Sequence, residues 1–153
     1  MKEEDIVKKL VLKFPQLANS IKVQRERRLM LEVASSGFTE LLEYVIKELG
    51  FSFLVMITGL DEGEKLSLIY HMEKEYGTIM NIKTSLPKSD PRTKTITNIL
   101  PNAEIYEREI SDLLGVVFEG LAPGNRYPLT DDWPKDQFPL RKDWKIEEGV
   151  TNA

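Results

Sequence analysis

Three segments with strand-like patterns follow one another between residues 51 and 86, and this succession constrains the fold more than any other feature of the chain. The segment FSFLVMITGL predicts a buried strand, DEGEK predicts a turn, and EKLSLIYHM predicts the second strand of a hairpin. TIMNIKTSL predicts a third strand. Because short turns join strands that run in opposite directions, we expect an antiparallel sheet.

Helical patterns lie upstream of this sheet. Apolar residues recur at helical spacing in residues 5–14, where Pro15 ends the pattern, and again in residues 38–49, for which Ser36 is a candidate N-cap. Residues 21–33 alternate twice around a turn and predict two more strands. The expected fold class is therefore α+β, an antiparallel sheet with helices packed on one face.

Composition excludes several kinds of chemistry. The 153 residues suit one domain, and they include no cysteine and one histidine. The chain itself therefore offers no thiolate nucleophile, no cysteine-ligated zinc and no iron-sulfur cluster. The histidine, His71, falls on a predicted strand, where a lone histidine is usually structural.

The charge and hydropathy patterns limit the partners and the location. A net charge of −4 gives no overall positive field to attract nucleic acid or anionic lipid. No apolar run approaches the roughly 20 residues of a membrane-spanning helix. The N-terminal sequence MKEEDIVKKL lacks the apolar stretch of a secretory signal. We expect a cytoplasmic protein that binds no nucleic acid and does not insert into a membrane.

The stretch IYEREISDLLGVVFEG predicts a third helix, with Asn102 as a candidate N-cap. One side of this helix is an apolar stripe suited to packing on the sheet, made of Tyr106, Ile110, Leu113, Leu114 and Val117. The opposite side carries a polar row of Glu104, Arg108, Asp112 and Gly115, in which Arg108 can pair with both acids.

Three interpretations of the polar row remain open at this point. It is a solvated helix face, or a pair of catalytic carboxylates, or a surface for another protein. A catalytic pair needs two carboxylates that converge on one cleft, whereas Glu107 and Glu109 point in nearly opposite directions. A partner surface would use Gly115 as the place where a second backbone comes close to the helix.

From Phe118 onward the chain shows no helical or strand period, yet this part holds four of the eight prolines and both tryptophans. Disordered segments avoid such aromatics, so this part has apolar area to bury against something. We expect two parts: an α+β body, residues 1–117, and an extended C-terminal arm, residues 118–153. The arm either wraps its own body or docks on a partner subunit, with Trp133 and Phe138 as apolar anchors.

The two motifs YEREISDLLGVVFEG and LTDDWPKDQFPLRKDW together resemble the signature of the 30 kDa (C) subunit of respiratory complex I and its hydrogenase relatives. The matching positions are Glu107, Arg108, Glu109, Asp112, Gly115, Phe118, Gly120, Asp131, Asp132, Trp133, Pro139, Leu140, Arg141, Lys142 and Asp143. With Phe138, these are the residues that we expect to bind a partner.

The resemblance implies a non-catalytic subunit without a cofactor of its own. Its expected partners are a large subunit, of the 49 kDa or nickel-iron hydrogenase type, and a small iron-sulfur subunit. Those neighbours would carry the iron-sulfur clusters and, in a hydrogenase, the nickel-iron centre. The complex would lie on the cytoplasmic face of the cell membrane and translocate ions.

Two departures from the complex I pattern affect this assignment. Residues 121–126 read LAPGNR where complex I members have a histidine-proline-aspartate motif, and Thr130 replaces a proline. With the compact length, these departures favour an energy-converting nickel-iron hydrogenase of the membrane-bound kind. The alternatives are the equivalent subunit of NADH:quinone oxidoreductase or a related dehydrogenase, and a free-standing α+β domain that binds a small ligand.

Overall fold

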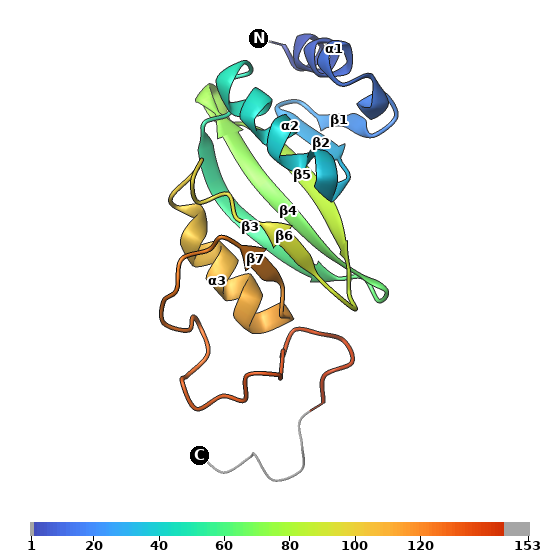
Figure 1. The fold of residues 1–153 in the computed structure, drawn as a ribbon. Helices are drawn as coiled ribbons and strands as arrows, with labels where there is room; N and C mark the ends of the chain where they lie inside the picture. Colours follow the sequence, from blue (N-terminus) through green and yellow to red (C-terminus); the bar gives the residue numbers. More distant parts are fainter. Residues whose placement is uncertain (1, 146–153) are drawn as a thin grey trace.

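The computed structural model of the chain describes residues 2–145. Its helices and strands follow in the order α1 Glu3–Lys13, β1 Ile21–Arg25, β2 Arg28–Glu32, α2 Ser35–Lys47, β3 Phe53–Asp61, β4 Lys65–Lys74, β5 Thr78–Pro87, β6 Arg92–Lys94, α3 Ala103–Leu114 and β7 Val117–Glu119 (Figure 1). The helices and the main strands lie close to the segments that the sequence predicts. Ser36 is not the N-cap of α2, which begins one residue before it and has Ala34 as its cap.

The main sheet has five strands in the order β1-β2-β5-β4-β3. Strands β3, β4 and β5 form the predicted antiparallel succession, and β1 pairs antiparallel with β2. Within this sheet, β2 and β5 are the one parallel pair, because α2 and the β3-β4 hairpin intervene between them and return the chain to the same end of the sheet. The α+β class is confirmed, with a mostly antiparallel sheet.

Helices α2 and α3 pack on the same face of this sheet. The Phe38 ring of α2 lies 4.3 Å from the Tyr70 ring of β4, measured between centroids. A Cβ on Gly59 of β3 would lie 2.5 Å from the side chain of Leu114 on α3. Gly59 pairs with Leu68, which shares a face with Tyr70 because it lies two residues away on the same strand. The sequence prediction of helices on one face is therefore confirmed.

The opposite face of the sheet is polar around His71. Its Nε2 lies 2.9 Å from the Thr58 hydroxyl and its Nδ1 lies 2.7 Å from the Asn81 side-chain oxygen. Both ring nitrogens are thus occupied by neighbours on adjacent strands, which is the structural role expected for a lone histidine.

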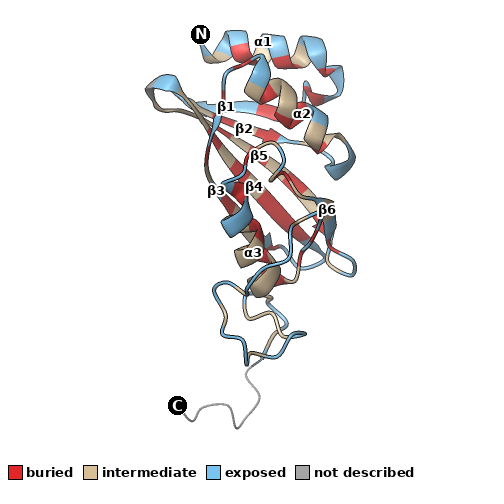
Figure 2. Cartoon of the chain, turned by 60° about the vertical axis from the view of Figure 1, so that its left-hand side comes forward, coloured by how far each residue is buried: buried red, intermediate tan, exposed pale blue. Residues whose placement is uncertain are grey.

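The apolar core lies between the sheet and the helices and extends from Ile6 to Phe118. Figure 2 shows buried positions on the strands beneath the helices, and exposed or intermediate positions along the segment that follows β7. Beyond Glu119, the arm has no buried residue up to 145, where the described part of the chain ends. Among residues 2–145, no helix is long and apolar enough to cross a bilayer.

A small second sheet joins the connector before α3 to the start of the arm. The connector, which the sequence predicts to be irregular, contains β6, and β6 pairs parallel with β7. Strand β7 spans residue 117, at which the sequence analysis places the end of the body.

Candidate functional site

The polar row of α3 is held by neighbours within the chain. Arg108 pairs with Glu104 at 2.8 Å, as predicted, but it does not pair with Asp112. Asp112 instead pairs with Arg126 of the arm at 3.0 Å and accepts a hydrogen bond from the backbone N–H of Leu129. The prediction that Arg108 pairs with both acids is therefore confirmed for Glu104 and wrong for Asp112, because the arm supplies another cation for Asp112.

Glu107 is the buried member of the same motif, with no exposed surface. Its carboxylate accepts hydrogen bonds from the Thr95 hydroxyl and from the backbone N–H of Ile96, the latter at 2.9 Å. Burial raises the pKa of the Glu107 carboxyl. This side chain thus fastens the connector that precedes α3, and it faces the interior of the body.

Gly115 ends α3 in the left-handed conformation, with a φ of 73°. Its nearest neighbour is the Phe138 ring, and a Cβ at this position would lie 2.6 Å from a ring carbon. The close approach that the sequence suggests at Gly115 is therefore made, within this chain, by the arm.

The PLRKD segment of the arm binds the C-terminal end of α3. The backbone N–H of Leu140 donates to the Leu113 carbonyl at 3.0 Å, and Nε of Arg141 donates to the Leu114 carbonyl at 2.7 Å. These carbonyls are among those left unpaired at the end of any helix, and a cation is favoured there by the helix dipole. The Arg141 guanidinium also lies 4.8 Å from the centre of the Phe138 ring.

Asp61, at the end of β3, is a second attachment point that sequence reasoning missed. Its side chain is 1% exposed, pairs with Lys88 at 2.8 Å and accepts the backbone N–H of Lys142 at 2.8 Å. Lys88 also pairs with Asp143 at 2.9 Å. The hydrogen bond from Lys88 holds the pKa of Asp61 well below its usual range. In the sequence, the D-E-G turn predicts only a hairpin. The attachment could not be inferred because Lys88 and Lys142, which bind Asp61, are 27 and 81 residues away from it.

The tryptophans of the arm lie against each other, with ring centroids 5.9 Å apart. The Trp133 indole N–H donates to the Gln137 carbonyl, and its own carbonyl accepts from Arg126. Both rings are only half-buried, so each keeps apolar area exposed.

The predicted partner-binding positions thus divide by burial. The buried ones are Glu107 and Phe118; the half-buried ones are Arg108, Glu109, Asp112, Gly115, Trp133, Phe138, Pro139 and Arg141; and the exposed ones are Gly120, Asp131, Asp132, Leu140, Lys142 and Asp143.

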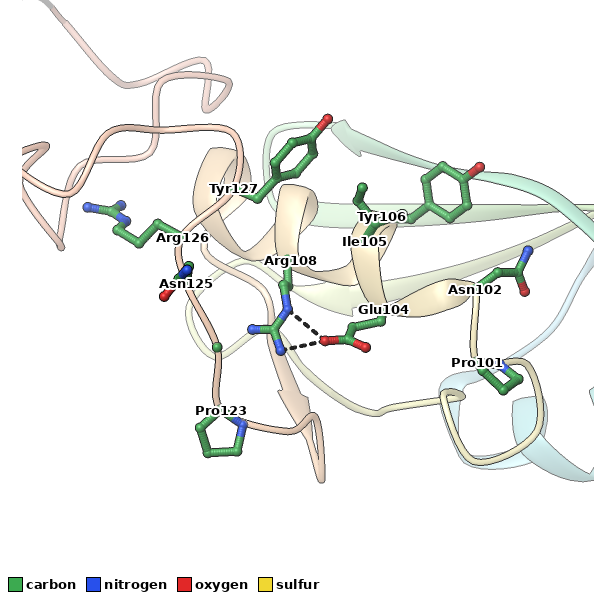
Figure 3. Close-up of a pocket in the computed structure, with 11 residues that line it drawn as sticks. Pro101, Asn102, Glu104, Ile105, Tyr106, Arg108, Pro123, Asn125, Arg126 and Tyr127 are labelled. Carbon is green, nitrogen blue, oxygen red and sulfur yellow. Dashed lines mark hydrogen bonds and ion pairs between the residues drawn. The ribbon is translucent and has the colours of Figure 1, made fainter.

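A groove of about 620 Å³ lies between the first turns of α3 and residues 123–127 of the arm (Figure 3). Arg108 and Glu104 lie at its centre, with Ile105 and Tyr127 beside them. Within residues 2–145, no group of three or more acidic or histidine side chains is placed to hold a metal ion. The groove offers a surface for recognition and brings together no pair of groups suited to acid–base catalysis.

Comparison with known proteins gives the class to which this chain belongs. The profile of the family described as "Respiratory-chain NADH dehydrogenase, 30 Kd subunit" matches residues 31–150. The chain belongs to this family, and the resemblance inferred from the two motifs is confirmed. Its relatives are subunits of complex I-like oxidoreductase complexes, including archaeal membrane complexes.

Two curated relatives differ in how much of their length is matched. The NADH-quinone oxidoreductase (C) subunit of Chloroherpeton thalassium is 33% identical over 105 residues, which are 67% of this chain and 43% of that relative. The F(420)H(2) dehydrogenase (C) subunit of Methanosarcina mazei is 28% identical over 155 residues, which are 99% of this chain and 96% of that relative. The chain therefore spans less than half of the first relative and nearly all of the second.

One solved structure is similar over most of the chain, including the arm. It is a chain of the membrane-bound sulfane sulfur reductase, an archaeal respiratory membrane complex. The two chains share 33% sequence identity and a TM-score of 0.84, over 94% of this chain and 85% of the other.

Proposed function

We propose that this chain is a non-catalytic assembly subunit of a membrane-bound, ion-translocating redox complex of the complex I type. The observation that carries the proposal is the extent of the similarity to the archaeal complexes. It covers 94% of this chain in the sulfane sulfur reductase and 99% in the F(420)H(2) dehydrogenase, so it includes the arm as well as the body.

The non-catalytic role is supported by the chemistry of the described residues. The two buried carboxylates among the described residues, Asp61 and Glu107, are both engaged in holding segments of the chain together. The composition adds that the chain has no cysteine. Electrons would pass through neighbouring subunits that carry iron-sulfur clusters, and this chain would position those subunits.

The expected contact surface combines α3 and the arm. The exposed residues Asp131, Asp132 and Leu140 and the half-exposed tryptophans are available to a partner, whereas Phe138 and Arg141 fix the arm to α3. The partners in this proposal are a large subunit, of the 49 kDa or hydrogenase type, and a small iron-sulfur subunit, on the cytoplasmic face of the membrane. Arg and Trp are enriched among the residues that contribute most to interfaces.

A more specific proposal concerns the kind of redox complex to which this chain belongs. The sequence departures at residues 121–126 favour a nickel-iron hydrogenase over NADH:quinone oxidoreductase. The relatives described above include an archaeal sulfane sulfur reductase and an archaeal F(420)H(2) dehydrogenase, but no hydrogenase. We therefore propose the archaeal type of respiratory membrane complex, and the hydrogenase assignment stays a prediction.

The test is purification of the intact complex through an affinity tag on this chain, from membranes of the native cells. We expect a large subunit and a small iron-sulfur subunit to co-purify with it in fixed ratio, and the separately expressed chain to contain no stoichiometric iron, nickel or flavin. A chain that purifies alone from gently solubilised membranes, or that itself binds a redox cofactor, would contradict the proposal.

A further inference from the structure

The groove between α3 and the arm has two exposed apolar side chains on its rim. Ile105 is 48% exposed and Tyr127 is 45% exposed, and both line the groove. Figure 3 shows them on the same side of Arg108, one from the helix and one from the arm. Apolar side chains of this size that stay half-exposed beside a hollow are typical of a surface that another chain covers.

Arg108 gives the groove a fixed cationic group. Its Nε and Nη2 both donate to Glu104 Oε1, at 3.1 and 2.8 Å, and Nη2 also donates to the Ala122 carbonyl at 2.7 Å. Nη1 has no hydrogen-bond acceptor among residues 2–145. A guanidinium side chain that is 16% exposed and has one unused nitrogen is suited to a further anionic acceptor.

Gly124 of the arm holds this guanidinium in place. A Cβ on Gly124 would lie 2.5 to 2.7 Å from the guanidinium atoms of Arg108, so the backbone of the arm lies directly against them. A side chain at residue 124 would displace Arg108. The direction of Nη1 is therefore set before any partner arrives, which lowers the entropic cost of binding.

Each of the two cations that line the groove has a carboxylate partner, at 2.8 Å for Arg108 and 3.0 Å for Arg126. Arg108 and Arg126 line it together with a single carboxylate, Glu104. Arg126 is neutralised from outside the lining by Asp112. What remains among these groups is one hydrogen-bond donor without an acceptor, Nη1 of Arg108, next to an apolar rim.

We infer that the groove binds a short acidic segment of the large subunit, in which a carboxylate meets Nη1 of Arg108 and an adjacent apolar side chain packs between Ile105 and Tyr127. This inference rests on the proposed function, because it takes the neighbouring subunit as the occupant. It adds the chemistry of that partner: an acidic residue beside an apolar one.

The test places opposite charges on the rim of the groove in the full chain. Ile105→Asp and Ile105→Lys remove the same apolar contact, but only the aspartate repels an acidic segment. Leu12→Asp and Leu12→Lys are the matched controls, since Leu12 is 85% exposed on α1, at the other end of the molecule. Each tagged variant is co-expressed with the untagged wild-type chain in the native cells, and the ratio of the two in the purified complex is measured.

We expect the ratio of Ile105→Asp to wild type in the complex to fall at least about tenfold. The ratio for Ile105→Lys should fall by a clearly smaller factor, and both Leu12 variants should match wild type. Tyr127→Asp should repeat the effect from the other wall if Ile105→Asp fails to fold. If the wild-type chain is in the complex but the aspartate and lysine variants lose equally, or neither loses, the inference of an acidic occupant is wrong. Absence of the wild-type chain from the complex would instead overturn the proposed function, and this inference with it.

Discussion

The body and the arm of this chain are held by different interactions. The body buries apolar side chains from Ile6 to Phe118 between one sheet and its helices. The arm after Glu119 has no buried residue up to position 145, and it is attached by hydrogen bonds to the Leu113 and Leu114 carbonyls and to Asp61. Folding of the body and attachment of the arm should therefore respond to different mutations.

The difference also suits the assembly role proposed above. The two tryptophans of the arm stack on each other and are only partly buried, so they leave apolar area accessible. The polar attachments of the arm fix the direction in which that area points. We infer that the arm is pre-positioned for binding, whereas the body is a stable base for it.

The largest expected effect comes from breaking the body itself. Phe38→Ala removes a ring that is 2% exposed and packs on Tyr70, and it should lower the free energy of unfolding by about 3–5 kcal/mol. Urea unfolding monitored by circular dichroism measures this loss. Leu12→Ala is the control and should change the stability by less than about 0.5 kcal/mol. A small loss for Phe38→Ala would mean that the core is not the source of stability.

The next effect concerns the attachment at Asp61. Asp61→Asn removes the charge that Lys88 and the Lys142 N–H require, and we expect a loss of roughly 1.5–3 kcal/mol together with faster amide exchange at Lys142. Asp143→Asn is the matched control, because Asp143 shares Lys88 but is 68% exposed. It should have a distinctly smaller effect.

The pH dependence of the same pair follows from the direction of the pKa shift. Because the pKa of Asp61 is lowered in the folded chain, its stabilisation is fully present above the ordinary aspartate pKa of about 4 and is lost as pH falls through the lowered value. The difference in stability between wild type and Asp61→Asn should thus be constant from pH 8 to about 4 and shrink below it. A difference that grows on acidification would contradict the assignment.

A smaller effect is expected at the end of α3, where two glycine substitutions distinguish backbone strain from contact with the arm. Gly115→Ala and Gly77→Ala place a side chain at nearly the same positive φ, 73° and 71°. Both should lose about 1–2 kcal/mol from the backbone alone. Only the alanine at 115 meets the Phe138 ring, since nothing lies within 4 Å of a Cβ at Gly77.

A double-mutant cycle isolates that contact. Phe138→Ala should recover part of the loss of Gly115→Ala, with a coupling of roughly 0.5 kcal/mol or more, and should leave Gly77→Ala unchanged. If Phe138→Ala recovers nothing, the ring does not lie against Gly115 in solution.

The smallest expected effect is at the buried carboxyl of α3. Because burial raises the pKa of Glu107, its contribution to stability is greatest below the ordinary glutamate pKa and declines as pH rises through the raised value. The isosteric Glu107→Gln does not titrate. Its stability should therefore improve relative to wild type between pH 4 and pH 8, in parallel urea titrations. A difference independent of pH would mean that Glu107 is not buried.

Local patterns were enough to predict the body, but not the arm. The strand alternation between residues 51 and 86 and most of the apolar stripe of α3 depend on neighbouring residues, so the antiparallel hairpins and the helices on one face could be inferred. The stripe was wrong at Val117, which lies beyond the helix in β7 and is exposed, because Gly115 ends α3 before it. The parallel pairing of β2 with β5 could not, because it joins segments separated by α2 and a hairpin. The motif at α3 also did not reveal which of its charges is buried, since Glu107 meets a connector that has no period of its own.

The attachment of the arm could not be predicted from the sequence for the same reason. Asp61 and Lys142 are 81 residues apart, and neither lies in a motif that requires the other. The PLRKD segment was expected to face a partner, yet its Arg141 and Lys142 also contact the body. Fixed charges in a motif can thus serve attachment within the chain as well as recognition, and only the contacts distinguish the two.

The most direct test of the central claim is a chain truncated after Gly120. The account predicts that this chain keeps a single cooperative unfolding transition, because β7 and every helix and strand of the described body precede the cut. It also predicts that the truncated chain no longer co-purifies with the large subunit when the two are co-expressed, whereas the full chain does. Binding of the truncated chain at full strength, or its failure to fold, would contradict the division into a stable body and a binding arm.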